Sequence, residues 1–211
     1  MGFFDRNRKE LERRGVDPSR LPPGQYFTER FPVLHAGSVP TYDDLSQWTF
    51  RVFGAVDGER VLSWSDLLAL PAVDLTVDIH CVTKWSKFDT GWRGVPFDTV
   101  VALAGVRPEA THVMWHSEHG FTANAPLEDV TGTDPDTGQP RAILAYEFGG
   151  EPLEPDHGYP LRALVPRLYF WKSAKWLRGI ELMVGDRPGF WEQNGYHMYG
   201  DPFRAQRYWG D

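Results

Sequence analysis

The clearest periodic pattern in the chain is the segment VDLTVDIH, where apolar and polar residues alternate from position 73 to position 80. A period of two is typical of a β-strand with one buried face, so the segment predicts a strand over 73–79. Continuing the period places Cys81 on the apolar face and sends His80 to the opposite face. The residues that follow are rich in tryptophan, glycine and proline, and we expect a loop there. Cys81 can therefore face a pocket at the end of the strand.

Elsewhere the pattern predicts short strands and few helices. Apolar runs bounded by glycine or proline favour strands at 48–55, 111–117, 121–124, 142–148, 161–165 and 180–184. A short charged helix is expected over 3–14, and two others over 64–70 and 98–104, the former behind a capping box of Ser63 and Asp66. Because turns rather than long helices separate the strands, we expect an α+β fold with mixed β-sheets.

The length of 211 residues allows one substantial hydrophobic core, and we expect a single compact domain. Within it, 1–40 reads as an N-terminal helix and an extended arm that wraps the domain, because prolines end the helix early. The core is expected over 41–185. Residues 186–211 have no regular period but many aromatic side chains, which favours a packed C-terminal tail over a disordered one.

Charge and composition exclude several classes of partner and location. The net charge of -7 comes from acids and bases mixed along the chain, which argues against nucleic acid as a partner. The apolar runs fall short of the roughly 20 residues that span a bilayer, and the charged first residues do not resemble a secretion signal. We therefore expect a cytoplasmic protein with no membrane partner, in which a single cysteine stays reduced.

Cys81 is the only cysteine, which excludes an intrachain disulfide and any cluster held by cysteines alone. It can be a nucleophile, a single thiolate ligand or a buried apolar residue. A cysteine hydrolase would need a nearby base, and no glycine elbow or helix start adjoins Cys81. A thiolate bound to a transition metal explains the position more economically.

Three histidines, His112, His116 and His119, suggest a zinc site by their proximity in sequence. On a strand, however, the first two are more widely spaced than zinc ligands on a helix, and no fourth ligand is evident nearby. We expect His116 to line a pocket instead.

Basic side chains are concentrated between positions 156 and 182, in DHGYPLRALVPRLYFWKSAKWLRGIEL. Converging cations of this kind can hold a phosphate or another anionic group by charge-assisted hydrogen bonds. A solvated basic face is the alternative reading of the same residues. The polar side chains concerned are His157, Arg162, Lys172, Ser173, Lys175 and Arg178.

Four motifs, arriving in order along the chain, carry a family resemblance: HCVTKWS followed by GWRGVPF, then HSEHGFTANAPLED, AYEFGGEPLEPDHGYPLRALVP and KSAKWLRGIEL. Together they resemble the molybdopterin-binding domain of the sulfite oxidase family, particularly its short, single-domain bacterial members. The resemblance covers nearly the whole chain and implies the molybdopterin-binding-domain fold. It implies a mononuclear molybdenum held by the dithiolene of one pyranopterin (molybdopterin), with Cys81 as the only protein ligand.

The resemblance also implies roles for other positions. His157 and Arg162 would contact the pterin, Ser173 and Lys175 would hold its phosphate, and Trp92 and Arg93 would flank the substrate approach to the metal. His35 and Gly37, in LHAG, would form a lid over the pterin.

The implied reaction is oxygen-atom transfer to or from a small sulfur-oxo or similar compound. No haem is expected, so an external electron-transfer partner would be required. A carrier that binds the cofactor without turnover is an alternative.

Overall fold

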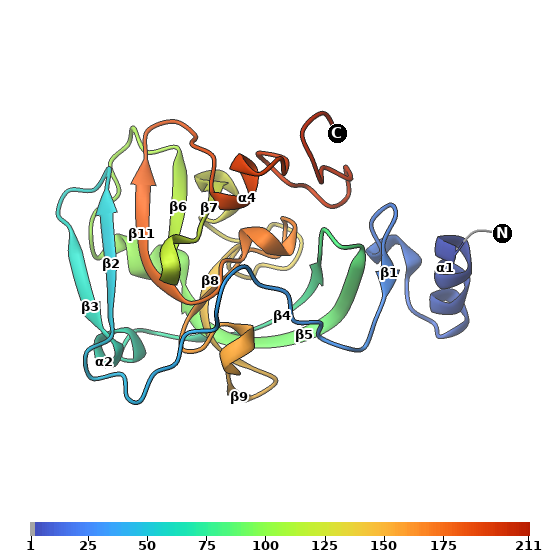
Figure 1. Cartoon of the computed structure of the whole chain (residues 1–211), viewed down its shortest axis with the longest axis horizontal. Helices are drawn as coiled ribbons and strands as arrows, with labels where there is room; N and C mark the ends of the chain where they lie inside the picture. Colours follow the sequence, from blue (N-terminus) through green and yellow to red (C-terminus); the bar gives the residue numbers. More distant parts are fainter. Residues whose placement is uncertain (1–2) are drawn as a thin grey trace.

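The computed structural model describes residues 3–211 and has two mixed β-sheets with short helices, in one α+β domain (Figure 1). The expected fold class is confirmed. The first sheet has the order β1-β5-β8-β10, with β4 paired to β5 and β9 to β8. Its strands are β1 (Tyr26–Phe27), β4 (Val73–His80), β5 (Trp85–Pro96), β8 (Ile143–Phe148), β9 (Glu151–Pro152) and β10 (Arg162–Leu164).

The second sheet has the order β3-β2-β11-β6-β7. Only its β2–β11 pair is parallel, as only the β1–β5 pair is in the first sheet. Each sheet is therefore mixed, as the sequence predicted. The strands are β2 (Thr49–Gly54), β3 (Arg60–Ser63), β6 (His112–Ser117), β7 (Thr122–Pro126) and β11 (Leu177–Met183).

The helices are short and join or close the sheets. In α2, Ser63 and Asp66 form the expected capping box, each side chain bonding the backbone N–H of the other. The α-helices are α1 (Phe3–Arg13), α2 (Trp64–Leu68), α3 (Phe97–Ala102) and α4 (Phe190–Gln193). Single 3-10 turns are η1 (Pro18–Arg20), η2 (Glu118–Gly120), η3 (Leu127–Asp129), η4 (Pro155–His157) and η5 (Phe170–Lys172).

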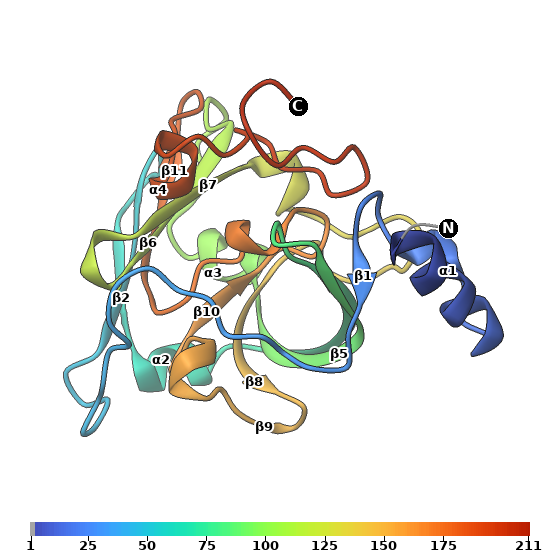
Figure 2. The ribbon, with the colours of Figure 1, turned by 45° about the vertical axis from the view of Figure 1, so that its right-hand side comes forward.

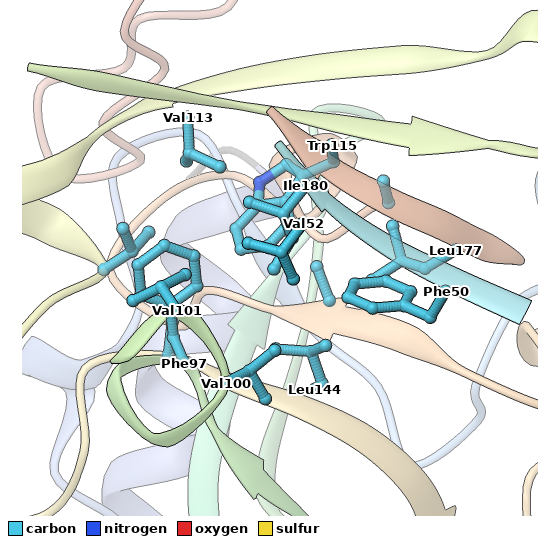
Figure 3. Close-up of a cluster of buried hydrophobic side chains, with 14 of the residues drawn as sticks. Phe50, Val52, Phe97, Val100, Val101, Val113, Trp115, Leu144, Leu177 and Ile180 are labelled. Atoms are coloured by element: carbon cyan, nitrogen blue, oxygen red, sulfur yellow. The ribbon is translucent and has the colours of Figure 1, made fainter. Parts of the chain in front are cut away.

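The main hydrophobic core lies between the two sheets and under α3 (Figure 3). Phe50 of β2, Trp115 of β6 and Phe97 of α3 are fully buried there. Complete burial of one such side chain stabilises the fold by about 1.5–3 kcal/mol. The core therefore holds the second sheet against the first.

The expectation of a loop after Cys81 was wrong. A tight turn at 81–84 leads directly into β5, the longest strand, which pairs with β4, β8 and β1. Glycine and charged residues interrupt the alternation of apolar and polar positions along this strand. Gly94 is required by a close approach, because a Cβ at this position would collide with the carbonyl oxygen of Leu144 on β8.

The two ends of the chain pack differently. Figures 1 and 2 place α1 at the opposite end of the molecule from β2 and β3, with β1 joining this end to the first sheet. The tail after β11 folds back across the molecule through α4, whose Glu192 is fully buried. Within residues 3–211, no helix is long and apolar enough to cross a membrane.

Candidate active site

A cavity of about 260 Å³ lies where the arm, the turn after β4, the segment 157–176 and the tail meet. Its lining is mostly aromatic and apolar, with a few polar groups, which is typical of a small-molecule or cofactor site. Cys81 and five of the predicted polar residues share it. The lining residues are Phe31, Pro32, Leu34, His35, Ala36, Cys81, Val82, Thr83, Trp85, Phe121, His157, Arg162, Phe170, Trp171, Ser173, Ala174, Lys175, Trp176, Trp191 and Tyr196.

Cys81 reaches the cavity from the first position after β4. The Cys81 N–H donates to the Trp85 carbonyl at 2.8 Å, and the Lys84 N–H donates to the Cys81 carbonyl at 3.0 Å, which closes the turn. Lys84 adopts a positive φ of 77° to do so. The predicted apolar-face position of Cys81 is confirmed, since the residue is 8% exposed and belongs to the hydrophobic cluster of the first sheet.

Burial raises the pKa of the Cys81 thiol, and hydrogen bonds from Thr83 and the Val82 N–H oppose this only in part. Its Sγ lies 3.2 Å from Oγ1 of Thr83. Within residues 3–211, no histidine ring is hydrogen-bonded to it. These features do not fit a hydrolase, which needs an activated thiolate beside a base. A bound metal ion would instead hold the sulfur deprotonated.

Arg162 is the dominant charge at the cavity. Its side chain is 1% exposed on β10, and its guanidinium donates to the carbonyls of His157 at 2.7 Å and Ser173 at 2.9 Å. It also lies over the Phe170 ring, 4.3 Å from the centroid. Among the residues that the structure describes, no carboxylate pairs with it. Burial lowers the pKa of Arg162 to about 9, which leaves the group charged at neutral pH.

Lys175 and His157 adjoin this cation. Burial, followed by the charge of Arg162, lowers the pKa of Lys175 to about 7. Burial together with Arg162 and Lys175 lowers the pKa of His157 to about 4, so its imidazole is neutral. The Lys175 ammonium donates to the carbonyls of Leu34 at 3.1 Å and Asp156 at 2.7 Å. The cluster therefore repels further positive charge and favours an anion.

Ser173 and His35 also line the cavity, but they are held in different ways. Ser173 is buried, and its Oγ accepts a hydrogen bond from the Val165 N–H at 2.9 Å. His35 lies in the exposed arm, where its Nδ1 is 3.0 Å from the carbonyl of Gly37. Gly37 does not line the cavity, although it adjoins Ala36, which does.

The structure does not bring Trp92 and Arg93 to the cavity surface. They are neighbours on β5 and point to opposite faces, as strand geometry requires. Trp92 is buried behind the cavity, with its ring centroid 5.3 Å from the Arg162 guanidinium carbon. Arg93 turns outward to Asp74 on β4, at 2.9 Å. The structure therefore leaves Arg93 outside the cavity lining, and Trp92 packs against Arg162 from behind.

Two further expectations are corrected. His116 does not line the cavity, because it lies on the outer side of β6 with its Nε2 2.9 Å from Glu181. Lys172, counted with the anion-binding cations, is buried away from the cavity and pairs with Glu192 at 2.7 Å. In the described part of the chain, no three or more His, Cys, Asp and Glu side chains are grouped so that they could hold a metal ion, and His112, His116 and His119 therefore do not form such a group.

Sequence reasoning missed several wall residues because they lie far away in the chain. Phe31 of the arm stacks on His157 with ring centroids 3.8 Å apart, and Leu34 supplies a carbonyl to Lys175. Trp191 and Tyr196 of the tail stack on each other at 4.9 Å and close the other side. The aromatic richness of the tail was the signal for Trp191 and Tyr196, and the LHAG stretch was the signal for the arm.

Comparison with known proteins identifies the family of the chain. A family model described as the oxidoreductase molybdopterin binding domain matches residues 36–191. An uncharacterized oxidoreductase of Bacillus subtilis, YuiH, is 48% identical over 94% of this chain and 97% of its own length. The sulfite oxidase of Arabidopsis thaliana is 28% identical over 90% of this chain, which spans 54% of that protein.

A solved structure gives the same result for the fold. The sulfane dehydrogenase SoxCD from Paracoccus pantotrophus superposes with a TM-score of 0.63 at 22% identity, over 72% of this chain and 42% of the other. The fold and these matches define the class of the protein, which is an oxidoreductase enzyme. The chain belongs to the oxidoreductase molybdopterin-binding domain family, to which sulfite oxidases are related. The family resemblance predicted from the sequence motifs is confirmed.

Proposed function

We propose that the chain binds a molybdenum–pyranopterin cofactor in this cavity, with Cys81 as the protein ligand of the metal, and catalyses oxygen-atom transfer. The substrate is a small sulfur-oxo or similar compound, and an external carrier exchanges the electrons. The observation that carries the proposal is Arg162, a buried cation without a carboxylate partner in residues 3–211, at the wall of a cavity that also contains a buried thiol.

The residues present fit an anionic cofactor. A buried charge is costly unless an opposite charge or a full set of hydrogen bonds compensates it, and carbonyl oxygens alone compensate Arg162 only in part. A phosphate group supplies the missing negative charge and accepts several hydrogen bonds at once. Here the proposal departs from the roles that the resemblance implied for Arg162 and Ser173. Arg162, as the uncompensated charge, would hold the phosphate together with Lys175, while the Ser173 segment and the neutral ring of His157 would contact the pterin beside it.

The cofactor, when bound, supplies the two-electron redox chemistry and the Lewis acidity of the metal. The protein supplies the Cys81 thiolate and orients it through the turn after β4. The aromatic walls exclude water, which strengthens each electrostatic interaction inside the cavity. Thr83, whose hydroxyl lies next to Sγ, fixes the rotamer of the cysteine.

The distribution of charge favours a substrate without a net negative charge. Along the described lining of the cavity, the charged side chains are Arg162 and Lys175, and the proposal assigns both to the cofactor phosphate. Arg93, the remaining candidate for an anionic substrate, is paired with Asp74 outside the cavity. Apart from the Thr83 hydroxyl, the wall near Cys81 consists of apolar and aromatic side chains such as Val82 and Trp85.

Metal analysis tests the proposal. The protein is made in a host that produces molybdopterin and in an otherwise identical host that does not. We expect near-stoichiometric molybdenum in the first preparation, at least a tenfold loss in Cys81→Ser, and full retention in Arg93→Ala, which changes a residue outside the cavity. A sulfoxide panel with an artificial electron donor then tests turnover, which a carrier would lack. Wild-type protein without molybdenum would refute cofactor binding.

A further inference from the structure

The N-terminal arm contacts the turn that carries Cys81, although the family model begins only at residue 36. Strand β1 pairs in parallel with the start of β5. The Tyr26 N–H donates to the Lys84 carbonyl at 2.8 Å, and the Thr28 N–H donates to the Ser86 carbonyl at 2.9 Å. The arm therefore holds the end of the 81–84 turn, and the start of β5 that follows it, with regular backbone hydrogen bonds.

Gln25, the residue before β1, contacts Cys81 directly. Its side chain is 1% exposed, and its Nε2 donates to the Cys81 carbonyl at 3.0 Å. The same carbonyl accepts the Lys84 N–H, so both of its lone pairs are used. Because a carbonyl can only accept, this contact also fixes which end of the Gln25 amide faces Cys81.

The buried amide is only partly satisfied. Its Oε1 has no hydrogen-bond partner in the described part of the chain, and Nε2 is 3.4 Å from the Tyr169 hydroxyl. A leucine would fill a buried position without this cost, because leaving a polar atom buried and unpaired lowers stability. Of the two hydrogen bonds that Nε2 donates, the one to the Cys81 carbonyl is the shorter, at 3.0 Å against 3.4 Å to Tyr169.

A tight turn delivers Gln25 to this position. The segment Pro22-Pro23-Gly24-Gln25 has the residues of a type II turn, with proline second and glycine third. Gly24 has φ +69°, and the Gln25 N–H donates to the Pro22 carbonyl at 3.2 Å. Arg207 of the tail donates to the Pro23 carbonyl at 2.8 Å, which ties the turn to the C-terminal end.

We infer that Gln25 is a positioning residue for Cys81, acting through the cysteine carbonyl, and that the arm is a structural part of the active site. This inference rests on the proposed function of Cys81 as the metal ligand. With its N–H bonded to Trp85 and its carbonyl bonded twice, Cys81 has a fixed peptide frame. The direction of its Cα–Cβ bond follows from that frame, so Gln25 keeps the sulfur directed into the cavity.

The test compares Gln25→Met, which keeps side-chain length but removes the donor, with Asn7→Leu. Asn7 is a matched control because its Oδ1 accepts the Phe27 N–H of β1 at 2.8 Å without contacting the cysteine turn. Gln25→Glu, which keeps the shape and loses the donor when ionised, is a second variant if the first does not fold.

Two measurements are made on each variant. In cofactor-free protein, the alkylation rate of Cys81 by iodoacetamide at one pH reports the turn alone, since the chain has no other cysteine. We expect it to rise about tenfold in Gln25→Met and to change less than twofold in Asn7→Leu. In protein from the cofactor-producing host, molybdenum content should fall about tenfold, in the range found for residues that orient metal ligands.

The outcomes separate the two proposals. Wild-type alkylation and wild-type molybdenum content in Gln25→Met would overturn the inference. Equal changes in Asn7→Leu would also overturn it, because the effect would then come from general loosening of the arm. If wild-type protein takes up no molybdenum, the proposed function fails, and the alkylation rates alone decide whether Gln25 positions Cys81.

Discussion

Two buried cations differ in what surrounds them: Lys172 anchors the tail, whereas Arg162 borders the cavity. Both side chains are almost completely inaccessible, at 0% and 1% exposed. The Lys172 ammonium bonds the Glu192 carboxylate at 2.7 Å, the Asn124 amide oxygen at 2.7 Å and the Met198 carbonyl at 2.6 Å. Arg162 bonds carbonyl oxygens and faces aromatic rings, without a carboxylate in residues 3–211.

The difference separates a structural cation from a binding one. Lys172 carries its counter-charge within the fold, and the Glu192 carboxylate also accepts the Trp171 indole N–H at 2.7 Å. The charge of Arg162 has no counter-charge within the described part of the fold and lies next to a cavity, so an anionic ligand bound there can neutralise it. The same substitution should therefore mainly lower stability at Lys172 and mainly lower cofactor retention at Arg162.

The largest expected effect is on the folding of the tail. Lys172→Met leaves Glu192 buried without its partner, and breaking a buried pair in this way costs about 3–5 kcal/mol. Urea unfolding of the cofactor-free protein measures the change in the free energy of unfolding. The double variant Lys172→Met, Glu192→Gln should recover part of the loss. A loss below 1 kcal/mol in the single variant would show that the pair does not anchor the tail.

Arg162→Met should affect cofactor retention more than folding. Removing the buried charge relieves a desolvation cost, while the carbonyls that it bonded lose a donor, so we expect a destabilisation below about 2 kcal/mol. Cofactor retention should fall about 100-fold, equivalent to about 2.7 kcal/mol, because truncating one partner of a buried charge pair costs 2–5 kcal/mol. Molybdenum content after dialysis measures it. Full retention in a folded variant would contradict the phosphate assignment.

The smallest expected effect is the pH dependence contributed by Lys175. Its pKa of about 7 in the folded chain lies below its ordinary value of 10.5, so the unfolded chain binds more protons between these limits. The resulting penalty is fully present below pH 7 and is lost as the pH rises toward 10.5. From pH 7 to 9.5, cofactor-free wild type should gain about 1–2 kcal/mol relative to Lys175→Met, discounted for partial exposure. If urea unfolding curves of the two proteins show no relative gain in the free energy of unfolding, the Lys175 ammonium is not destabilised by burial.

Local signals in the sequence were sufficient for part of the fold. The alternation of 73–80 identified β4 and the face of Cys81, and the spacing of Ser63 and Asp66 identified the start of α2. Strand β5 was missed because Gly91, Gly94 and the charged residues between 87 and 93 break its period, while pairing on both edges holds it in place. Strand pairing over long distances is a property that a single segment does not display.

The site was predictable only in part, for the same reason. Composition showed a cluster of cations, but nothing local distinguished Lys172 from Arg162, because the distinguishing carboxylate comes from the tail. The motif order supplied the assignment of Arg162 and Lys175 to a cofactor, and both do line the cavity with Cys81. Gln25 was missed, although PPGQ is a recognisable type II turn signal.

The cavity walls come from Phe31 of the arm and Tyr196 of the tail, nearly the whole chain apart. Contacts between such distant residues form late, because closing long loops costs entropy before any contact repays it. A chain synthesised only as far as β11 already contains every strand of both sheets, yet it lacks the tail residues that line the cavity. Because Trp191 and Tyr196 line the cavity, a pocket with all of its walls requires synthesis through residue 196, and under the proposed function we expect the cofactor to be inserted after that point.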